Sequence, residues 1–218
     1  MIRTNLYDMH IWEKIPPHER RDLLIAWLAL SLAFTLMMVW GQRLSPVIIG
    51  TYFMVSLLTA GIGFIVHEMA HKFTAMRYGF WAEFQMSSMM LVVAVAMAAI
   101  AGVVFAAPGA TVIYGNYISK DENGKISLAG PLSNLILIIP FAAVLFAGIT
   151  MGATILTVIG LEGIRVNSML AAFNLLPIGP LDGAKILKWN PAIFAGMILV
   201  AFGLLYGTLS GILFNGVI

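Results

Sequence analysis

The stretch that decides the fold is residues 47–76, which read VIIGTYFMVSLLTAGIGFIVHEMAHKFTAM. Its first twenty residues carry no charge, and its last part carries two histidines, a glutamate and a lysine. A run of about 20 apolar residues is long enough to cross the hydrocarbon core of a bilayer as a helix. We therefore expect a long transmembrane helix with ionisable side chains near its C-terminal end.

The composition of the whole chain indicates the same environment. Of its 218 residues, 61% are hydrophobic and 10% are charged. Soluble domains are about 45–50% apolar and about 25% charged, so a soluble core of this size would leave much apolar surface in water. The net charge of +2 is too small to indicate a nucleic-acid partner, and the lack of cysteine excludes disulfides and thiolate metal ligands.

Several apolar runs predict an all-α, polytopic membrane protein with about five to six transmembrane helices. These runs cover approximately residues 23–41, 47–76, 86–107, 127–147, 149–177 and 191–214. Residues 80–85 and 111–115 are rich in aromatic or β-branched side chains, which predicts short interfacial β segments. Residues 120–125 are polar and contain Asn-Gly, which predicts a turn.

The N-terminal residues 1–22 are polar, and several of them are basic. Basic residues beside a transmembrane helix favour the cytoplasmic side. We therefore expect a cytoplasmic N-terminal segment at 1–22 and a single transmembrane domain at 23–218, with its core at about 47–190. Lys72 and Arg77 predict that the helix at 47–76 also ends on the cytoplasmic side.

Residues 67–71, HEMAH, have the spacing of a zinc site. Two histidines four positions apart lie on one face of a helix, so both imidazoles can reach the same Zn²⁺. Glu68 is then placed to act as general base on a metal-bound water. Ionisable groups at the end of an apolar helix are costly in lipid and usually functional. The alternative is a polar helix end that faces water at the interface.

A third protein ligand is needed, because a catalytic zinc ion usually has three protein ligands and one water. The remaining histidines, His10 and His18, lie in the N-terminal segment, so the candidates are carboxylates. Those downstream of His71 are Glu83, Asp121, Glu122, Glu162 and Asp182. Asp182 is the best placed, because it follows an apolar run near the membrane surface. The Asp-Gly pair at 182–183 is also typical of an ordinary surface turn.

Taken together, two motifs resemble those of the site-2 protease family of intramembrane zinc metalloproteases. HEMAH at 67–71 is similar to the HExxH helix of that family, and NLLPIGPLDG at 174–183 is similar to its N-x-x-P-x-x-x-x-D-G motif. The resemblance implies one zinc ion per chain, held by His67, His71 and Asp182, with Glu68 as the catalytic base. GPLSN at 130–134 also resembles a Gly-Pro-x-x-Asn helix of the family.

The same resemblance assigns two asparagines to substrate and oxyanion binding, namely Asn174 and Asn134. Each asparagine is equally able to hydrogen-bond between helices without contacting a substrate. The implied activity is hydrolysis of a peptide bond in or near a transmembrane helix of a membrane-protein substrate. Three alternatives stay open: a zinc hydrolase for a lipid or small amide, a transporter with a structural or transported metal, and a helix-binding scaffold.

A shared zinc ion also constrains the topology of the chain. If Asp182 joins the two histidines, an even number of membrane crossings must separate them. Three apolar runs lie between, so one of them should not cross. We expect this to be the re-entrant segment or hairpin at 86–107, because strand-like segments flank it and Pro108-Gly109 follows it. The active site should then lie near the cytoplasmic side of a cell membrane.

Overall fold

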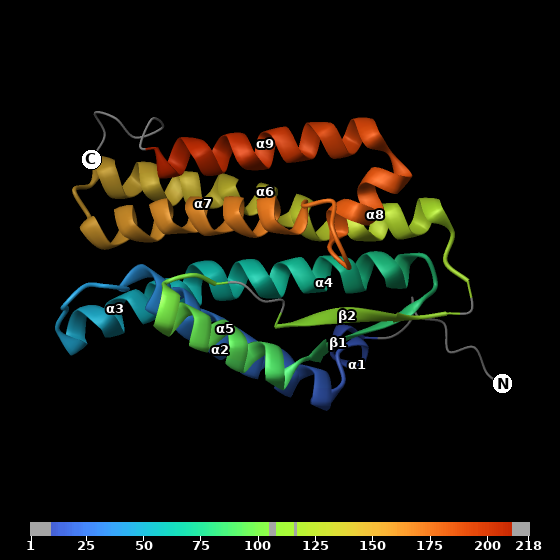
Figure 1. The fold of residues 1–218 in the computed structure, drawn as a ribbon, viewed down its shortest axis with the longest axis horizontal. Helices are drawn as coiled ribbons and strands as arrows, with labels where there is room; N and C mark the ends of the chain where they lie inside the picture. Colours follow the sequence, from blue (N-terminus) through green and yellow to red (C-terminus); the bar gives the residue numbers. More distant parts are fainter. Residues whose placement is uncertain (1–9, 105–107, 116, 211–218) are drawn as a thin grey trace.

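The computed structural model describes residues 10–104, 108–115 and 117–210. Within these ranges, five helices are long and apolar enough to cross a membrane (Figure 1). They are α2 (Pro17–Met38), the continuous helix Pro46–Arg77, α6 (Lys120–Thr150), α7 (Thr154–Asn174) and α9 (Pro191–Leu209). This arrangement confirms the predicted all-α polytopic class, with the smaller of the two expected numbers of transmembrane helices.

The first long helix, α2, begins at Pro17, six residues before the expected start of the apolar run. Proline is favoured in the first turn of a helix, where its missing N–H needs no partner, and an acidic residue such as Glu19 suits the positive end of the helix dipole. A single turn, α1 (Ile11–Lys14), precedes it. Residues 17–22 therefore form the start of α2, and the cytoplasmic position of residues 1–22 stays a prediction.

The long helix at Pro46–Arg77 consists of α3 (Pro46–Ser56), a π-helical turn η1 (Leu57–Gly61) and α4 (Ile62–Arg77). A π turn shifts the backbone hydrogen bonds by one residue and is frequent at functional sites. Here the indole Nε1 of Trp27 in α2 donates to the carbonyl of Leu57 at 3.0 Å. This contact joins α2 to the irregular turn that precedes the HEMAH helix.

The predicted β segments form a two-stranded antiparallel sheet of β1 (Trp81–Met86) and β2 (Gly109–Tyr114). Between them lies α5 (Ser88–Ala101), which has 14 residues and packs against α2. At about 1.5 Å per residue it spans roughly 21 Å, less than the roughly 30 Å of a hydrocarbon core. Met86 pairs with Gly109, so the chain leaves and returns at the same end of the sheet.

This return agrees with the re-entrant segment expected at 86–107, of which residues 105–107 lie outside the described residues. The long helices between α4 and Asp182 are α6 and α7, which run antiparallel in Figure 1. Two is the even number of crossings that a shared metal ion requires.

The prediction of a polar turn at 120–125 is wrong, because these residues form the first turns of α6. Ser119 and Glu122 make a capping box in which each side chain bonds the backbone N–H of the other residue. Such a box satisfies two free donors of a helix start and outweighs the turn preference of Asn-Gly. Gly130 and Pro131, which lie near the start of the expected apolar run at 127–147, are consequently in the interior of α6.

The helices and the sheet make layers on either side of α4 (Figure 1). The pair α6 and α7 lies on one side of it, followed by α9, while α2, α5 and the sheet lie on the other. The largest cluster of buried apolar side chains joins α2, α4 and β1, and includes Phe34, Phe64 and Phe84. A second cluster joins α7, α9 and α8 (Asp182–Trp189). The HEMAH face of α4 therefore lies between packed layers.

Candidate metal centre

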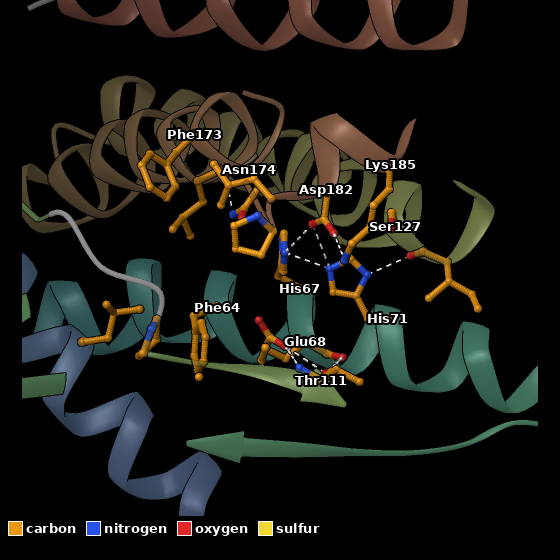
Figure 2. A pocket seen from close by; sticks show the side chains of 18 of the residues that line it. Phe64, His67, Glu68, His71, Thr111, Ser127, Phe173, Asn174, Asp182 and Lys185 are labelled. Atoms are coloured by element: carbon orange, nitrogen blue, oxygen red, sulfur yellow. Dashed lines mark hydrogen bonds and ion pairs between the residues drawn. The ribbon is translucent and has the colours of Figure 1, made fainter. Parts of the chain in front are cut away.

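The three predicted ligands meet in the structure, although Asp182 lies 111 positions after His71 in the chain. The Nε2 atoms of His67 and His71 on α4 lie 3.0 Å apart. Oδ2 of Asp182 is 3.4 Å from Nε2 of His67 and 3.1 Å from Nε2 of His71 (Figure 2). All three side chains are buried, and among the described residues they form the one group of this kind able to hold a metal ion.

Asp182 reaches the histidines because α8 starts tightly against the end of α7. It is the first residue of α8, after a short loop that follows Asn174. A Cβ atom on Gly183 would lie 2.0 Å from the carbonyl oxygen of Leu175, so only glycine allows this approach. Asp182 is only 7% exposed, which does not fit the alternative of an ordinary surface turn.

The histidines also control the charge of Asp182. Burial by itself raises the pKa of this carboxyl group, but when His71 and His67 carry a proton on Nε2 they outweigh burial through charge and hydrogen bonds and hold its pKa below the usual range. A buried carboxylate stays ionised when opposite charges and donors surround it. Asp182 is therefore in the form that binds a cation.

Two further observations test whether the group fits zinc. Nδ1 of His71 is 2.8 Å from the carbonyl oxygen of Ile126, which can only accept, so Nδ1 carries a proton and Nε2 is the nitrogen left to bind a metal ion. A Cβ atom on Gly130 would lie 2.3 Å from Nε2 of His71 and 2.6 Å from Nε2 of His67. Glycine at this position therefore leaves room where the three donor atoms converge.

Two imidazole nitrogens and one carboxylate oxygen are a ligand set of catalytic zinc sites, in which a fourth position stays open. The group of His67, His71 and Asp182 accordingly fits one zinc ion.

Glu68 lies beside the ligands and is held by the sheet. Its Oε2 accepts hydrogen bonds from the backbone N of Thr111 at 3.0 Å and from Oγ1 of Thr111 at 2.8 Å. Its other oxygen, Oε1, has no hydrogen-bond partner among the described residues. The sequence predicted a strand around Thr111 but no role for this side chain, because 43 residues separate it from Glu68.

The two predicted substrate asparagines occupy different places. Asn174 lines the cavity beside the metal group, and its Nδ2 donates to the carbonyl of Leu170 at 3.0 Å. Asn134 is fully buried in α6 with its Oδ1 2.7 Å from Nδ1 of His67, and it does not line that cavity. The substrate or oxyanion role of each residue stays a prediction.

A cavity of about 330 Å³ contains the metal group and Glu68. Its apolar walls come from α2, α4 and α7, and one side is formed by residues 108–111 at the start of β2. Polar side chains line its other end, namely Asn123, Ser127 and Lys185. In Figure 2, Phe64 and Phe173 lie at the apolar part, and Lys185 lies beyond the metal ligands. The cavity can therefore accept a largely apolar chain next to the metal.

The fold and this group define a polytopic membrane protein with a buried site for one zinc ion. No family model and no solved structure matches the chain. A Methanocaldococcus jannaschii protein named "Putative zinc metalloprotease MJ0611" is 43% identical over 152 residues, which are 69% of this chain and 78% of that protein. The chain belongs to the family of this zinc metalloprotease.

Proposed function

We propose that the protein is an intramembrane zinc metalloprotease of the site-2 protease type, which hydrolyses a peptide bond in or near a transmembrane helix of a membrane-protein substrate. The observation that carries this proposal is the cavity that contains both the metal group and Glu68 and has mostly apolar walls. A transporter needs the ligands but no general base. A carboxylate held beside the ligands, with one oxygen anchored, therefore favours hydrolysis.

His67, His71 and Asp182 would hold the zinc ion, which when bound polarises the scissile carbonyl and makes a coordinated water acidic enough to ionise near neutral pH. Glu68 accepts a proton from the attacking water and passes it to the leaving amine nitrogen. Thr111 anchors Oε2 of Glu68, which leaves Oε1 available for this transfer. Asn174 lies on the cavity wall, where it would hold the substrate backbone or the oxyanion.

The substrate must be extended at the scissile bond, because a helix keeps its carbonyl groups in hydrogen bonds. An extended segment gains affinity by pairing with a free sheet edge. The outer edge of β1 is occupied, because Phe84 N donates to Glu19 Oε1 at 2.9 Å and the Ala82 carbonyl accepts from Lys72 Nζ at 2.6 Å. Among the described residues, the outer edge of β2 is engaged only at Thr111, where the N–H donates to Glu68 Oε2, and residues of β2 line the cavity. We therefore propose that the extended segment of the substrate pairs with the outer edge of β2.

The distribution of basic residues supports a cytoplasmic position for the active site and for the N-terminus. Lysine and arginine are enriched on the cytoplasmic side of transmembrane helices. In Figure 1 the start of α6, the end of α4, and α8 lie toward the same end of the molecule, and α8 begins with the ligand Asp182. These segments carry Lys72, Arg77, Lys120, Lys125, Lys185 and Lys188, and the start of α2 carries Arg20 and Arg21.

The proposal is tested on the full chain purified in detergent, by measuring bound zinc and cleavage of a model transmembrane substrate. Wild type and Glu68→Gln should each bind about one zinc ion, and only wild type should cleave. Equal cleavage by both would exclude Glu68 as the base. If wild type binds zinc but does not cleave, a transported or structural metal is favoured. If wild type binds no zinc, a helix-binding scaffold is favoured.

A further inference from the structure

On the side of His67 that faces away from the cavity, two buried asparagines form a hydrogen-bond network that joins three helices. Asn134 of α6 places Oδ1 2.7 Å from Nδ1 of His67. Its Nδ2 donates to the carbonyl of Gly63 at 3.1 Å and to Oδ1 of Asn167 in α7 at 3.0 Å. Both asparagines are 0% exposed, so water cannot replace these contacts.

Two backbone carbonyls determine which way the two amides point. The oxygen of Gly63 can only accept, so the atom of Asn134 that faces it is the amide nitrogen, and the amide oxygen faces His67. Asn167 is oriented in the same manner, because its Nδ2 donates to the carbonyl of Gly163 at 2.8 Å and its Oδ1 thus faces Asn134. Nδ1 of His67 must then be the donor, and Nε2 carries the lone pair.

We propose that Asn134 and Asn167 are a positioning pair for the metal centre, which selects the His67 tautomer that presents its Nε2 lone pair to zinc. This role differs from the substrate or oxyanion role predicted for Asn134, because Asn134 lies on the opposite side of His67 from the metal. Asn167 lies in neither of the motifs that mark the site. The proposal concerns zinc binding and does not depend on the identity of the substrate.

The competing tautomer explains why such a pair is needed. With the proton on Nε2, His67 would donate to Oδ2 of Asp182, 3.4 Å away, and two of the three ligand atoms would be joined to each other. A low-dielectric interior strengthens such a bond and would oppose metal binding. An acceptor at Nδ1 removes this alternative, and loss of the acceptor behind a metal-binding histidine typically weakens metal affinity about 10–100-fold.

The test compares zinc affinities, measured by competition with a chromophoric chelator on the full chain in detergent. Asn134→Leu removes the acceptor and should weaken zinc binding about 10–100-fold. Asn134→Asp keeps an oxygen facing Nδ1 and should stay within a few-fold of wild type. Asn167→Leu should have an intermediate effect, because Gly63 still orients Asn134.

Ser168→Ala is the matched control. Ser168 is also 0% exposed and adjacent to Asn167, but its hydroxyl donates within its own helix, to Ile164 O. Its replacement should leave zinc affinity unchanged. The absorption spectrum of bound Co²⁺ gives a second measurement, and should change in Asn134→Leu and be retained in Asn134→Asp.

If Asn134→Leu and Asn134→Asp weaken zinc binding equally, the proposal is overturned, because side-chain packing and not the hydrogen-bond acceptor would then determine zinc affinity. Unchanged affinity in Asn134→Leu would also overturn it. If Asn134→Leu does not fold, wild-type affinity in Asn167→Leu would overturn the role of the pair. Because no substrate is used, these outcomes are independent of whether the protein proves to be a protease.

Discussion

At the scale of single residues, the space for the metal depends on a missing side chain. A Cβ atom on Gly130 would lie within 2.6 Å of both ligand nitrogens of the histidines. Gly130→Ala should therefore abolish zinc binding while the helices remain folded, as measured by zinc per chain and circular dichroism. Gly203→Ala is the control, because nothing lies within 4 Å of a Cβ there. One zinc ion per chain in Gly130→Ala would show that the metal lies elsewhere.

A second residue-scale prediction concerns the anchor of the proposed base. Thr111→Val removes one of the two hydrogen bonds to Oε2 of Glu68 and keeps the side-chain shape. A hydrogen bond to a charged group contributes about 1.5–3 kcal/mol, and each 1.36 kcal/mol is tenfold in rate, so kcat should fall about tenfold or more. Zinc content should be unchanged.

Thr111→Ser retains the hydroxyl and should restore most of the rate. If the Val and Ser variants have the same kcat as wild type, the hydroxyl does not position Glu68. If both are equally slow, the hydroxyl group alone is not sufficient to position Glu68, and the methyl group of Thr111 is needed as well.

At the scale of the elements, the pairing of β1 with β2 indicates which backbone groups are free for a substrate. Phe84 and Thr111 are partners, yet their N–H groups bond Glu19 and Glu68, so they are directed away from each other. Hydrogen-bonded and non-hydrogen-bonded pairs alternate along an antiparallel ladder, so the next pair whose N–H groups point away from each other is Ala82 with Ile113. The N–H of Ile113 therefore points away from β1.

Ile113→Pro removes this donor without breaking the β1–β2 ladder, since proline is tolerated where the N–H does not join the ladder. We expect a higher KM for a transmembrane substrate with unchanged zinc content. Ile113→Ala controls for the side chain, which lines the cavity, and should raise KM less. Equal KM values for the Pro and Ala variants would contradict pairing of the substrate at this position of β2.

At the scale of the whole molecule, the position of the metal centre relative to the membrane can be tested with single cysteines, because the native chain has none. Tyr117 precedes α6 and is 79% exposed, whereas Met151 follows α6 and is 73% exposed. A thiol reagent that does not cross membranes should label Tyr117→Cys only after the cytoplasmic side is opened, and Met151→Cys in intact cells. The opposite pattern would place the active site on the outer side.

The sequence alone determined the features that depend on short spacings. Helical periodicity brings His67 and His71 to one face, and apolar length predicts the membrane class and the long helices. The requirement for an even number of membrane crossings between His71 and Asp182 also selected 86–107 as the segment that does not cross the membrane. The first two inferences need only the geometry of one helix or the thickness of a bilayer, and the third also needs Asp182 as a ligand of the same metal ion.

Tertiary structure decided the contacts between residues far apart in the chain. Asn134 lies 67 positions from His67, and Thr111 lies 43 positions from Glu68, so no local pattern indicates that either pair meets. The capping box that turned 120–125 into helix outweighed a local turn preference. The reason is physical: hydrogen bonds in a buried site depend on how layers of helices pack, and packing involves the whole chain at once.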